Sequence, residues 1–252
     1  MTPTLLELPY SPWSELAKWA LDARGITYAR QRYQPLLGEP GLRRRLGRWR
    51  GPVSVPVLFT DDGPLDGTLA IARWADGRGD GLPLFPAAHD AEIVRWAERA
   101  QEGLAAGRAL SLPRVADDPA AVAELTPKFA RALGPVGRAL TRSGVHRTRR
   151  KYGATAQTLD EHQAVLERVL EEIRAAIGAT PRDGGLVGPL TYADFAAAQV
   201  LCYVDPPPHA ILPIGAANRA RWGDPDLAAR YADVIAWRDE LYARARHSAR
   251  RE

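Results

Sequence analysis

Residues 53–74 have the sequence V-S-V-P-V-L-F-T-D-D-G-P-L-D-G-T-L-A-I-A-R-W, and the rest of the chain can be placed around them. Alternating apolar residues between Val53 and Phe59 predict a β-strand, and Asp62-Gly63 is a hairpin-turn signal. A short strand at residues 64–66 would return beside the first one. Thr68 is then expected to cap a helix whose apolar residues face inward.

Pro56 is unusual in the middle of this strand pattern, because proline has no N–H to donate to a neighbouring strand. One interpretation is an edge-strand proline beside an ordinary capped helix. The other is a cis Val55-Pro56 bond that turns the Val55 N–H and C=O outward, where they can pair with an extended, peptide-like ligand. In that case the free N–H groups of the helix that begins at Thr68 would suit the carboxylate of such a ligand. The residues alone leave both interpretations open.

The segment before this stretch predicts a strand, a helix and a second strand. Leu5, Leu6 and Leu8 indicate a buried strand, and Ser11-Pro12 is a typical helix start. Gly25 would end that helix, and a second strand is expected between Ile26 and Tyr33. With a short helix at residues 42–49, residues 1–78 have the order β-α-β-α-β-β-α of a thioredoxin-like α/β domain.

Beyond residue 78 the sequence predicts helices alone. Residues 79–88 have the glycine and proline content of a linker, and residues 89–252 are expected to form an all-helical domain. Its predicted helices cover residues 91–108, 119–140, 158–177 and 226–246. Another follows Thr191, which forms a capping-box pattern with Asp194. A loop is expected from residue 206 to residue 224.

Composition excludes several classes of protein. The 252 residues contain no apolar run near the ~20 needed to cross a membrane, and one cysteine, Cys202, excludes a disulfide framework. The N-terminal residues do not resemble a secretory signal, so we expect a cytoplasmic protein. Five scattered histidines predict no metal site. The net charge is +4, and the clusters Arg43–Arg45 and Arg147–Lys151 are interpreted as solvated faces, with no nucleic-acid and no membrane partner.

Two short motifs resemble the glutathione-binding half of the glutathione S-transferase family. V55-P56-V57-L58 matches the family's V-P-V-L segment with its cis-proline, and G67-T68-L69-A70-I71 is similar to the E-S-x-A-I segment that follows. Thr68 keeps the hydroxyl of the family's serine, whereas Gly67 replaces its glutamate. The resemblance implies a thioredoxin-like domain followed by an all-α helical domain, glutathione as co-substrate, and a homodimer.

S11-P12-W13-S14 in turn resembles the S-P-F-S motif of serine-type members. A thiol titrates near ~8.5, so such an enzyme must stabilise the glutathione thiolate by a hydrogen-bond donor or a helix N-terminus. The resemblance assigns this role to Ser11, with Ser14 second and Tyr10 third. Each also has an ordinary interpretation: Ser11 as an N-cap, Ser14 as a polar residue of the first helical turn, and Tyr10 as a half-buried aromatic residue. The glutathione-binding residues implied in this way are Trp13, Val55, Pro56, Asp66, Gly67 and Thr68.

Two hypotheses about function follow. The first is a glutathione transferase whose thiolate attacks a hydrophobic electrophile, bound between Trp13 and the apolar residues from Leu104 to Leu112. The second is a non-catalytic relative that uses the same scaffold for protein–protein association, a hypothesis favoured by Gly67 in place of glutamate.

Overall fold

The computed structural model describes residues 2–35, 37–151, 158–179 and 184–246, and the backbone alone at residues 128, 129 and 149–151. The N-terminal part consists of β1 (Thr4–Glu7), α1 (Pro12–Ala23), β2 (Ala29–Arg32), α2 (Glu39–Leu46), β3 (Val57–Thr60), β4 (Gly63–Asp66) and α3 (Thr68–Asp76). This is the predicted β-α-β-α-β-β-α order. No helix in these ranges is long and apolar enough to cross a membrane.

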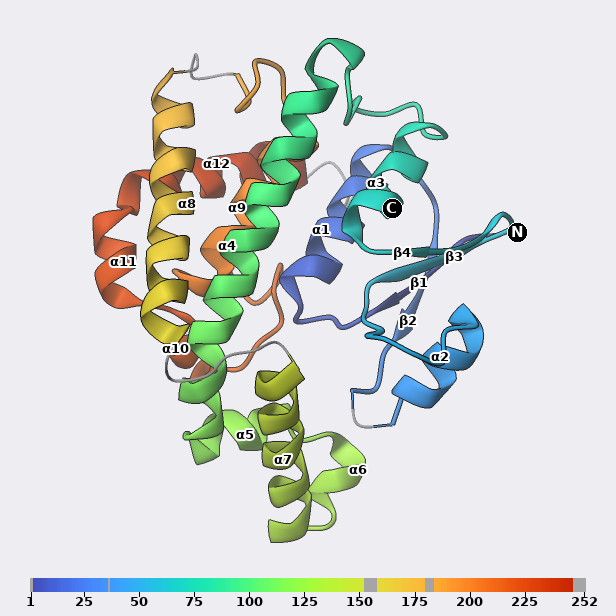
Figure 1. Cartoon of the computed structure of the whole chain (residues 1–252), viewed down its shortest axis with the longest axis vertical. Coiled ribbons are helices and arrows are strands. Elements are labelled where there is room, and N and C mark those ends of the chain that lie inside the picture. The colour runs from blue at the N-terminus through green and yellow to red at the C-terminus, as the bar shows by residue number, and fades with distance from the viewer. Residues whose placement is uncertain (1, 36, 152–157, 180–183, 247–252) are drawn as a thin grey trace.

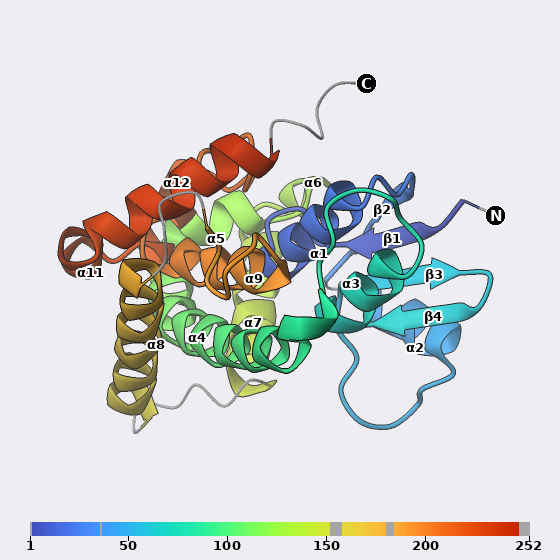
Figure 2. The same ribbon diagram turned by 90° about the horizontal axis from the view of Figure 1, so that it is seen from above.

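The four strands form one mixed sheet in the order β2-β1-β3-β4. β1 is parallel to β2 and antiparallel to β3, and β4 is antiparallel to β3. Leu5 and Leu58 point to one face, where they pack against residues of α1 and α3. Leu6 and Val57 point to the other face, where Leu42 of α2 covers them. Helices therefore cover both faces of the sheet (Figures 1 and 2).

The rest of the described chain is helical. It comprises the 3-10 turn η1 (Ala87–His89) and helices α4 (Asp90–Ala116), α5 (Pro119–Leu125), α6 (Lys128–Arg131), α7 (Pro135–Lys151), α8 (Leu159–Ala179) and α9 (Tyr192–Val200), then η3 (Leu201–Tyr203), α10 (Ala216–Trp222), α11 (Pro225–Arg230) and α12 (Ala232–Arg246). The long helix α4 lies beside α8 and α9, and α9 also packs against α1 of the N-terminal domain (Figure 1). The structure thus confirms a thioredoxin-like α/β domain followed by an all-helical one.

Several boundaries differ from the sequence predictions, and proline or glycine explains two of the differences. β3 begins only at Val57, after the cis peptide bond between Val55 and Pro56. The predicted helix over residues 119–140 is divided into α5, α6 and α7, because Pro127 lies between the first two and Gly134 precedes α7 with a φ of 54°. The predicted helix over residues 226–246 is interrupted at Tyr231. Helix α10 lies where a loop was expected.

The capping predictions were confirmed at one helix and wrong at another. Thr191 and Asp194 form a complete capping box at the start of α9, and the Asp194 carboxylate also accepts the Leu186 N–H at 2.7 Å. Thr68 does not cap α3: it is the first residue of that helix, and Gly67 holds the N-cap position with a φ of 93°. A side chain at position 67 would be strained at this φ, which explains glycine there.

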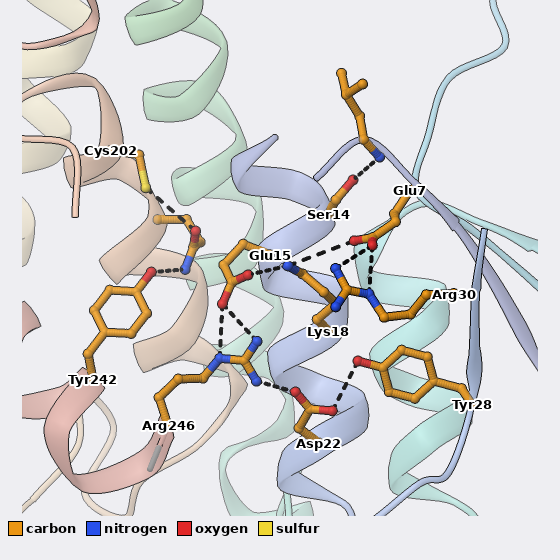
Figure 3. A network of polar contacts seen from close by, with 12 residues as sticks. Glu7, Ser14, Glu15, Lys18, Asp22, Tyr28, Arg30, Cys202, Tyr242 and Arg246 are labelled. Atoms are coloured by element: carbon orange, nitrogen blue, oxygen red, sulfur yellow. Dashed lines mark hydrogen bonds and ion pairs between the residues drawn. The ribbon is translucent and has the colours of Figure 1, made fainter. Parts of the chain in front are cut away.

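A buried network of charged side chains holds α1 against the sheet and against the C-terminal helix (Figure 3). Glu15 of α1 is 1% exposed, and its carboxylate contacts Lys18 Nζ at 2.6 Å and Arg246 Nε at 2.9 Å. Glu7 of β1 contacts Arg30 of β2 at 2.6 Å and Lys18 at 3.8 Å. Because Arg246 ends α12, the network joins the two ends of the described chain.

The first prediction concerns this network. Replacing Arg246 by methionine leaves Glu15 buried with Lys18 as its remaining cation, and breaking a buried ion pair in this way costs about 3 kcal/mol of unfolding free energy. Arg244, two residues away, is exposed, so Arg244→Met should change stability by less than about 0.5 kcal/mol. Urea denaturation of both variants measures the difference, and an equal effect of the two would contradict a structural role for the network.

The second prediction concerns the contact of α4 with η3. A Cβ at Gly107 would lie 2.5 Å from the Tyr203 Cβ, whereas a Cβ at Gly178 in α8 would meet no atom within 4 Å. Overpacking costs about 1–3 kcal/mol, which exceeds the roughly 0.5–1 kcal/mol that alanine gains over glycine in a helix. Gly107→Ala should therefore lower the thermal midpoint and Gly178→Ala should raise it. A stabilised Gly107→Ala protein would show that the helices can move apart freely.

Candidate active site

The segments that carry the predicted site residues converge at one edge of the sheet. Leu6 of β1 is paired with Val57 of β3, and Val57 is paired with Asp66 of β4. Because β3 is antiparallel to both neighbours, the end of β1, the beginning of β3 and the end of β4 share this edge. The chain leaves β1 toward Ser11, enters β3 through Val55-Pro56, and leaves β4 into Gly67 and α3. The strand register thus brings together what the sequence separates by more than forty residues.

Ser11 is at the N-cap position of α1, as predicted, but its hydroxyl does not cap the helix. Its backbone is extended, with φ −93° and ψ 127°, and its carbonyl accepts the Glu15 N–H at 2.9 Å. The side chain is half-buried and forms no hydrogen bond to the amides of the first turn. A hydroxyl at a helix N-terminus that is not used for capping remains available to a ligand. The assignment of Ser11 as the residue that stabilises a thiolate stays a prediction.

Ser14 and Tyr10 are placed differently. Ser14 is fully buried, and its Oγ accepts the Leu8 N–H at 3.1 Å, so it ties the end of β1 to α1. Tyr10 packs against the core of the helical domain, and burial raises the pKa of its hydroxyl to about 12. Both side chains make structural contacts, and a catalytic role for either stays a prediction. Cys202, the one cysteine, is also buried, which raises the pKa of its thiol to about 12.

The Val55-Pro56 peptide bond is cis, as one of the two interpretations of the sequence proposed. The Pro56 carbonyl accepts the Gly67 N–H at 3.3 Å and so joins this bend to the start of α3. Within the described chain, the Val55 N–H and C=O form no backbone hydrogen bond. An ideal Cβ at Gly67 would meet no atom within 4 Å, so open space lies beside this corner. An extended ligand therefore has both unpaired backbone groups and room at the same place.

Thr68 is engaged by the helical domain. Its side chain is 5% exposed, and its Oγ1 accepts a hydrogen bond from Gln101 Nε2 at 3.3 Å. Gln101 Oε1 in turn accepts the Trp13 Nε1–H at 2.6 Å. This chain of two hydrogen bonds joins the first turns of α1 and α3 to the middle of α4. The phenol of Tyr192, whose pKa burial raises above its ordinary value, hydrogen-bonds the same threonine.

The free N–H groups at the start of α3 suit the negative charge of an anionic ligand. Ile71 donates to the Gly67 carbonyl, but within the described chain the N–H groups of Thr68, Leu69 and Ala70 donate to no carbonyl. Asp66, which the resemblance assigns to glutathione binding, forms an ion pair with Arg48 at 2.6 Å. The partial positive charge of the helix end therefore persists at this corner.

Sequence reasoning missed two residues of α4. Gln101 bridges Trp13 and Thr68, and the Arg108 guanidinium lies 4.4 Å from the centre of the Trp13 ring. The two are seven residues apart, a spacing that places both on one side of a helix, but they lie outside the apolar stripe used to predict α4. Trp13, which the resemblance assigns to glutathione binding, is thus held by a hydrogen bond at its ring nitrogen and by a cation over its ring. No cluster of potential metal ligands occurs among the residues described.

Comparison with known proteins agrees with this architecture. Residues 10–78 match the family model for the N-terminal domain of glutathione S-transferases. Comparison with curated protein sequences found no significant match. Residues 10–78 include α1, the cis bend and α3, which are the elements that meet at the candidate site.

Solved glutathione transferases have the same fold over the whole chain. One from Methylobacterium radiotolerans, in complex with glutathione sulfonate, is 20% identical with a TM-score of 0.61, and the match covers 97% of this chain and 92% of that one. One from Pseudomonas fluorescens, with bound glutathione, is 18% identical with a TM-score of 0.58 and covers 96% and 95%. One from Phanerochaete chrysosporium is 17% identical with a TM-score of 0.61 and covers both chains fully, at 100%.

These likenesses at low identity show the fold, and the family model identifies the N-terminal domain. The chain is a two-domain protein with a thioredoxin-like half and a helical half. Its residues 10–78 are similar to the N-terminal domain of glutathione S-transferases.

The third prediction tests the bridge through Gln101. Gln101→Met keeps the side-chain length but leaves the half-buried Trp13 Nε1–H and the buried Thr68 hydroxyl without this partner, so it should lower the unfolding free energy by about 1–3 kcal/mol. Gln163 hydrogen-bonds Glu167 one turn away on α8, and Gln163→Met is a matched control expected within about 0.5 kcal/mol of the unchanged protein. Urea denaturation measures both. An unchanged unfolding free energy in Gln101→Met would show that the bridge contributes nothing to the contact between the domains.

Proposed function

We propose that this protein is a glutathione transferase that uses Ser11 to stabilise the glutathione thiolate. The observation that carries the proposal is the convergence of an unused hydroxyl, unpaired Val55 backbone groups and the free N–H groups of α3 at one edge of the sheet. Solved relatives of the same fold were crystallised with glutathione or its analogues, which supports glutathione as the co-substrate.

In this proposal two parts of the tripeptide meet groups of matching chemistry. The Val55 N–H and C=O pair with the cysteinyl backbone, and the N–H groups at the start of α3 hold the γ-glutamyl carboxylate. The Thr68 hydroxyl, already bonded to Gln101, positions that helix end rather than acting alone on the ligand. Gly67 carries no carboxylate, so the α-amino group of the ligand lacks the partner that glutamate gives in the family pattern.

The reaction is attack of the thiolate on an electrophilic carbon. The new C–S bond either displaces a leaving group, which departs with the bonding electron pair, or adds across a polarised double bond, which then takes up a proton from solvent. The thiol proton leaves to solvent, and the Ser11 hydroxyl then donates a hydrogen bond to the negative sulfur. The electrophile would bind beside Trp13 and the stretch of α4 that follows Gln101, where Leu104 is buried and Leu110 and Leu112 are half-buried. We also propose a homodimer.

The fourth prediction compares two serines of the same helix. A hydrogen bond to a charged group contributes about 1.5–3 kcal/mol, so Ser11→Ala should raise the pKa of bound glutathione by about 1–2 units. Thiolate absorbance followed through a pH titration, with calorimetry of glutathione binding, measures this change. Ser14→Ala loses its bond to the Leu8 N–H and should lower stability while leaving the thiol pKa unchanged.

Two other outcomes would count against the proposal. If Ser14→Ala raised the thiol pKa and Ser11→Ala did not, the catalytic assignment would be wrong. If millimolar glutathione produced no heat with the unchanged protein, Gly67 would have removed the tripeptide site. The non-catalytic association hypothesis, which Gly67 favours, would then replace the transferase.

A further inference from the structure

The large apolar side chains that are exposed in the described chain are concentrated in two segments. Leu37 and Trp49 flank α2, while Leu133, Val136 and Leu140 lie between α6 and the middle of α7; all five are between 51% and 69% exposed. The two segments meet, because Arg147 Nη2 of α7 lies 3.4 Å from Glu39 Oε2 of α2. Both belong to the same end of the molecule, the lower end in Figure 1.

The same end is strongly basic. Between Leu125 and Leu159 the sequence contains eight Lys and Arg residues and no Asp or Glu. This segment therefore carries +8, while the remaining chain, with 26 basic and 30 acidic residues, carries −4. Arg138 and Arg142 are exposed, and neither forms an ion pair with an acidic residue in the described ranges. The side chains of residues 149–151, which end the predicted basic cluster, lie outside what the structure describes.

Helix α7 arranges these residues in parallel rows. Gly137, Thr141 and Val145, four residues apart, are buried against neighbouring helices. Val136 and Leu140 form an exposed apolar row on one side, and Arg138 and Arg142 form an exposed basic row on the other. A cavity of about 460 Å³ between α5, α6 and α7 adjoins them and is lined by Ala123, Glu124, Thr126, Arg131, Gly134 and Arg138. The Glu124 carboxylate in this lining accepts the N–H groups of Ala217 and Asn218 in α10. We define the α6–α7 face by Leu133, Val136, Leu140, Arg138 and Arg142.

We propose that the α6–α7 face binds the surface of a membrane that contains anionic lipid. Exposed apolar side chains and unpaired arginines on the two sides of one helix match a bilayer surface, where acyl chains lie beneath negatively charged phosphates. The cavity between Arg131 and Arg138 would suit a lipid phosphate, and Trp49 on the neighbouring segment is of the type that favours the membrane interface. This departs from the sequence expectation of no membrane partner and is independent of the transferase proposal.

Two other occupants fit these observations less well. A nucleic acid would neutralise the arginines, but it offers nothing to a row of valine and leucine side chains. A second copy of the chain would cover the apolar row, but a two-fold contact through this face would bring two +8 segments together. Both are distinguishable from a lipid surface by experiment.

The test is co-sedimentation of the full chain with phosphatidylcholine vesicles, with and without about 30% phosphatidylserine. We expect binding to the anionic vesicles alone, weakened by salt. An arginine near an anionic surface changes the partition coefficient about fivefold, so Arg138→Gln with Arg142→Gln should lower it about 30-fold. Val136→Ser with Leu140→Ser should lower it about tenfold or more at unchanged charge.

The matched control removes the same charge elsewhere. Arg95 of α4 and Arg244 of α12 are exposed and lie outside the α6–α7 face, so Arg95→Gln with Arg244→Gln should leave vesicle binding within about twofold of the unchanged protein. The proposal is overturned if the unchanged protein does not bind anionic vesicles, or if the control loses as much binding as the Arg138 and Arg142 pair. It is also overturned if Val136→Ser with Leu140→Ser dissociates a dimer in sedimentation velocity without changing vesicle binding, or if the face retains an oligonucleotide but no vesicle.

Discussion

The position of α1 depends on one buried carboxylate, that of Glu15. A charge with 1% exposure is stable only when cations face it, and here Lys18 of the same helix and Arg246 of the last helix do so. Lys18 also reaches toward Glu7, which Arg30 holds from the neighbouring strand. Helix α1 is therefore fixed along its length to the sheet and to the helical domain (Figure 3). Because Ser11 lies at the N-terminus of α1, these contacts also fix the position of Ser11.

The site is built by register and by hydrogen bonds rather than by any single motif. The row Leu6–Val57–Asp66 brings three chain segments to one edge, and the bond from Gly67 to the Pro56 carbonyl closes the corner between them. Gln101 then joins that corner to α4. Because Thr68 hydrogen-bonds Gln101, the corner of the sheet that carries the candidate site is joined directly to the helical domain.

Much of this architecture could be predicted from local signals. Ser11-Pro12 predicted the start of α1 and the Thr191–Asp194 capping box predicted α9. The resemblance of V55-P56-V57-L58 to the family segment implied the cis bend, which the residues alone left open. The failures have physical reasons. The broken helices follow Pro127 and Gly134, whose effects compete with an apolar periodicity that continues through them. Thr68 was misplaced because glycine at positive φ can hold the N-cap position without a side chain.

The sequence by itself determined the class of fold, the order of the elements in the N-terminal domain and the segments that meet at the candidate site, because turn, cap and strand signals act between neighbours in the chain. Only the tertiary structure decided which residues of those segments have a hydroxyl or backbone group that forms no hydrogen bond within the described chain. Ser11 and Ser14 are similar in sequence context, yet one hydroxyl is unused and the other holds the Leu8 N–H. Gln101 and Arg246 form hydrogen bonds with residues of distant segments, and long-range contacts of this kind produce no periodic pattern in a single sequence.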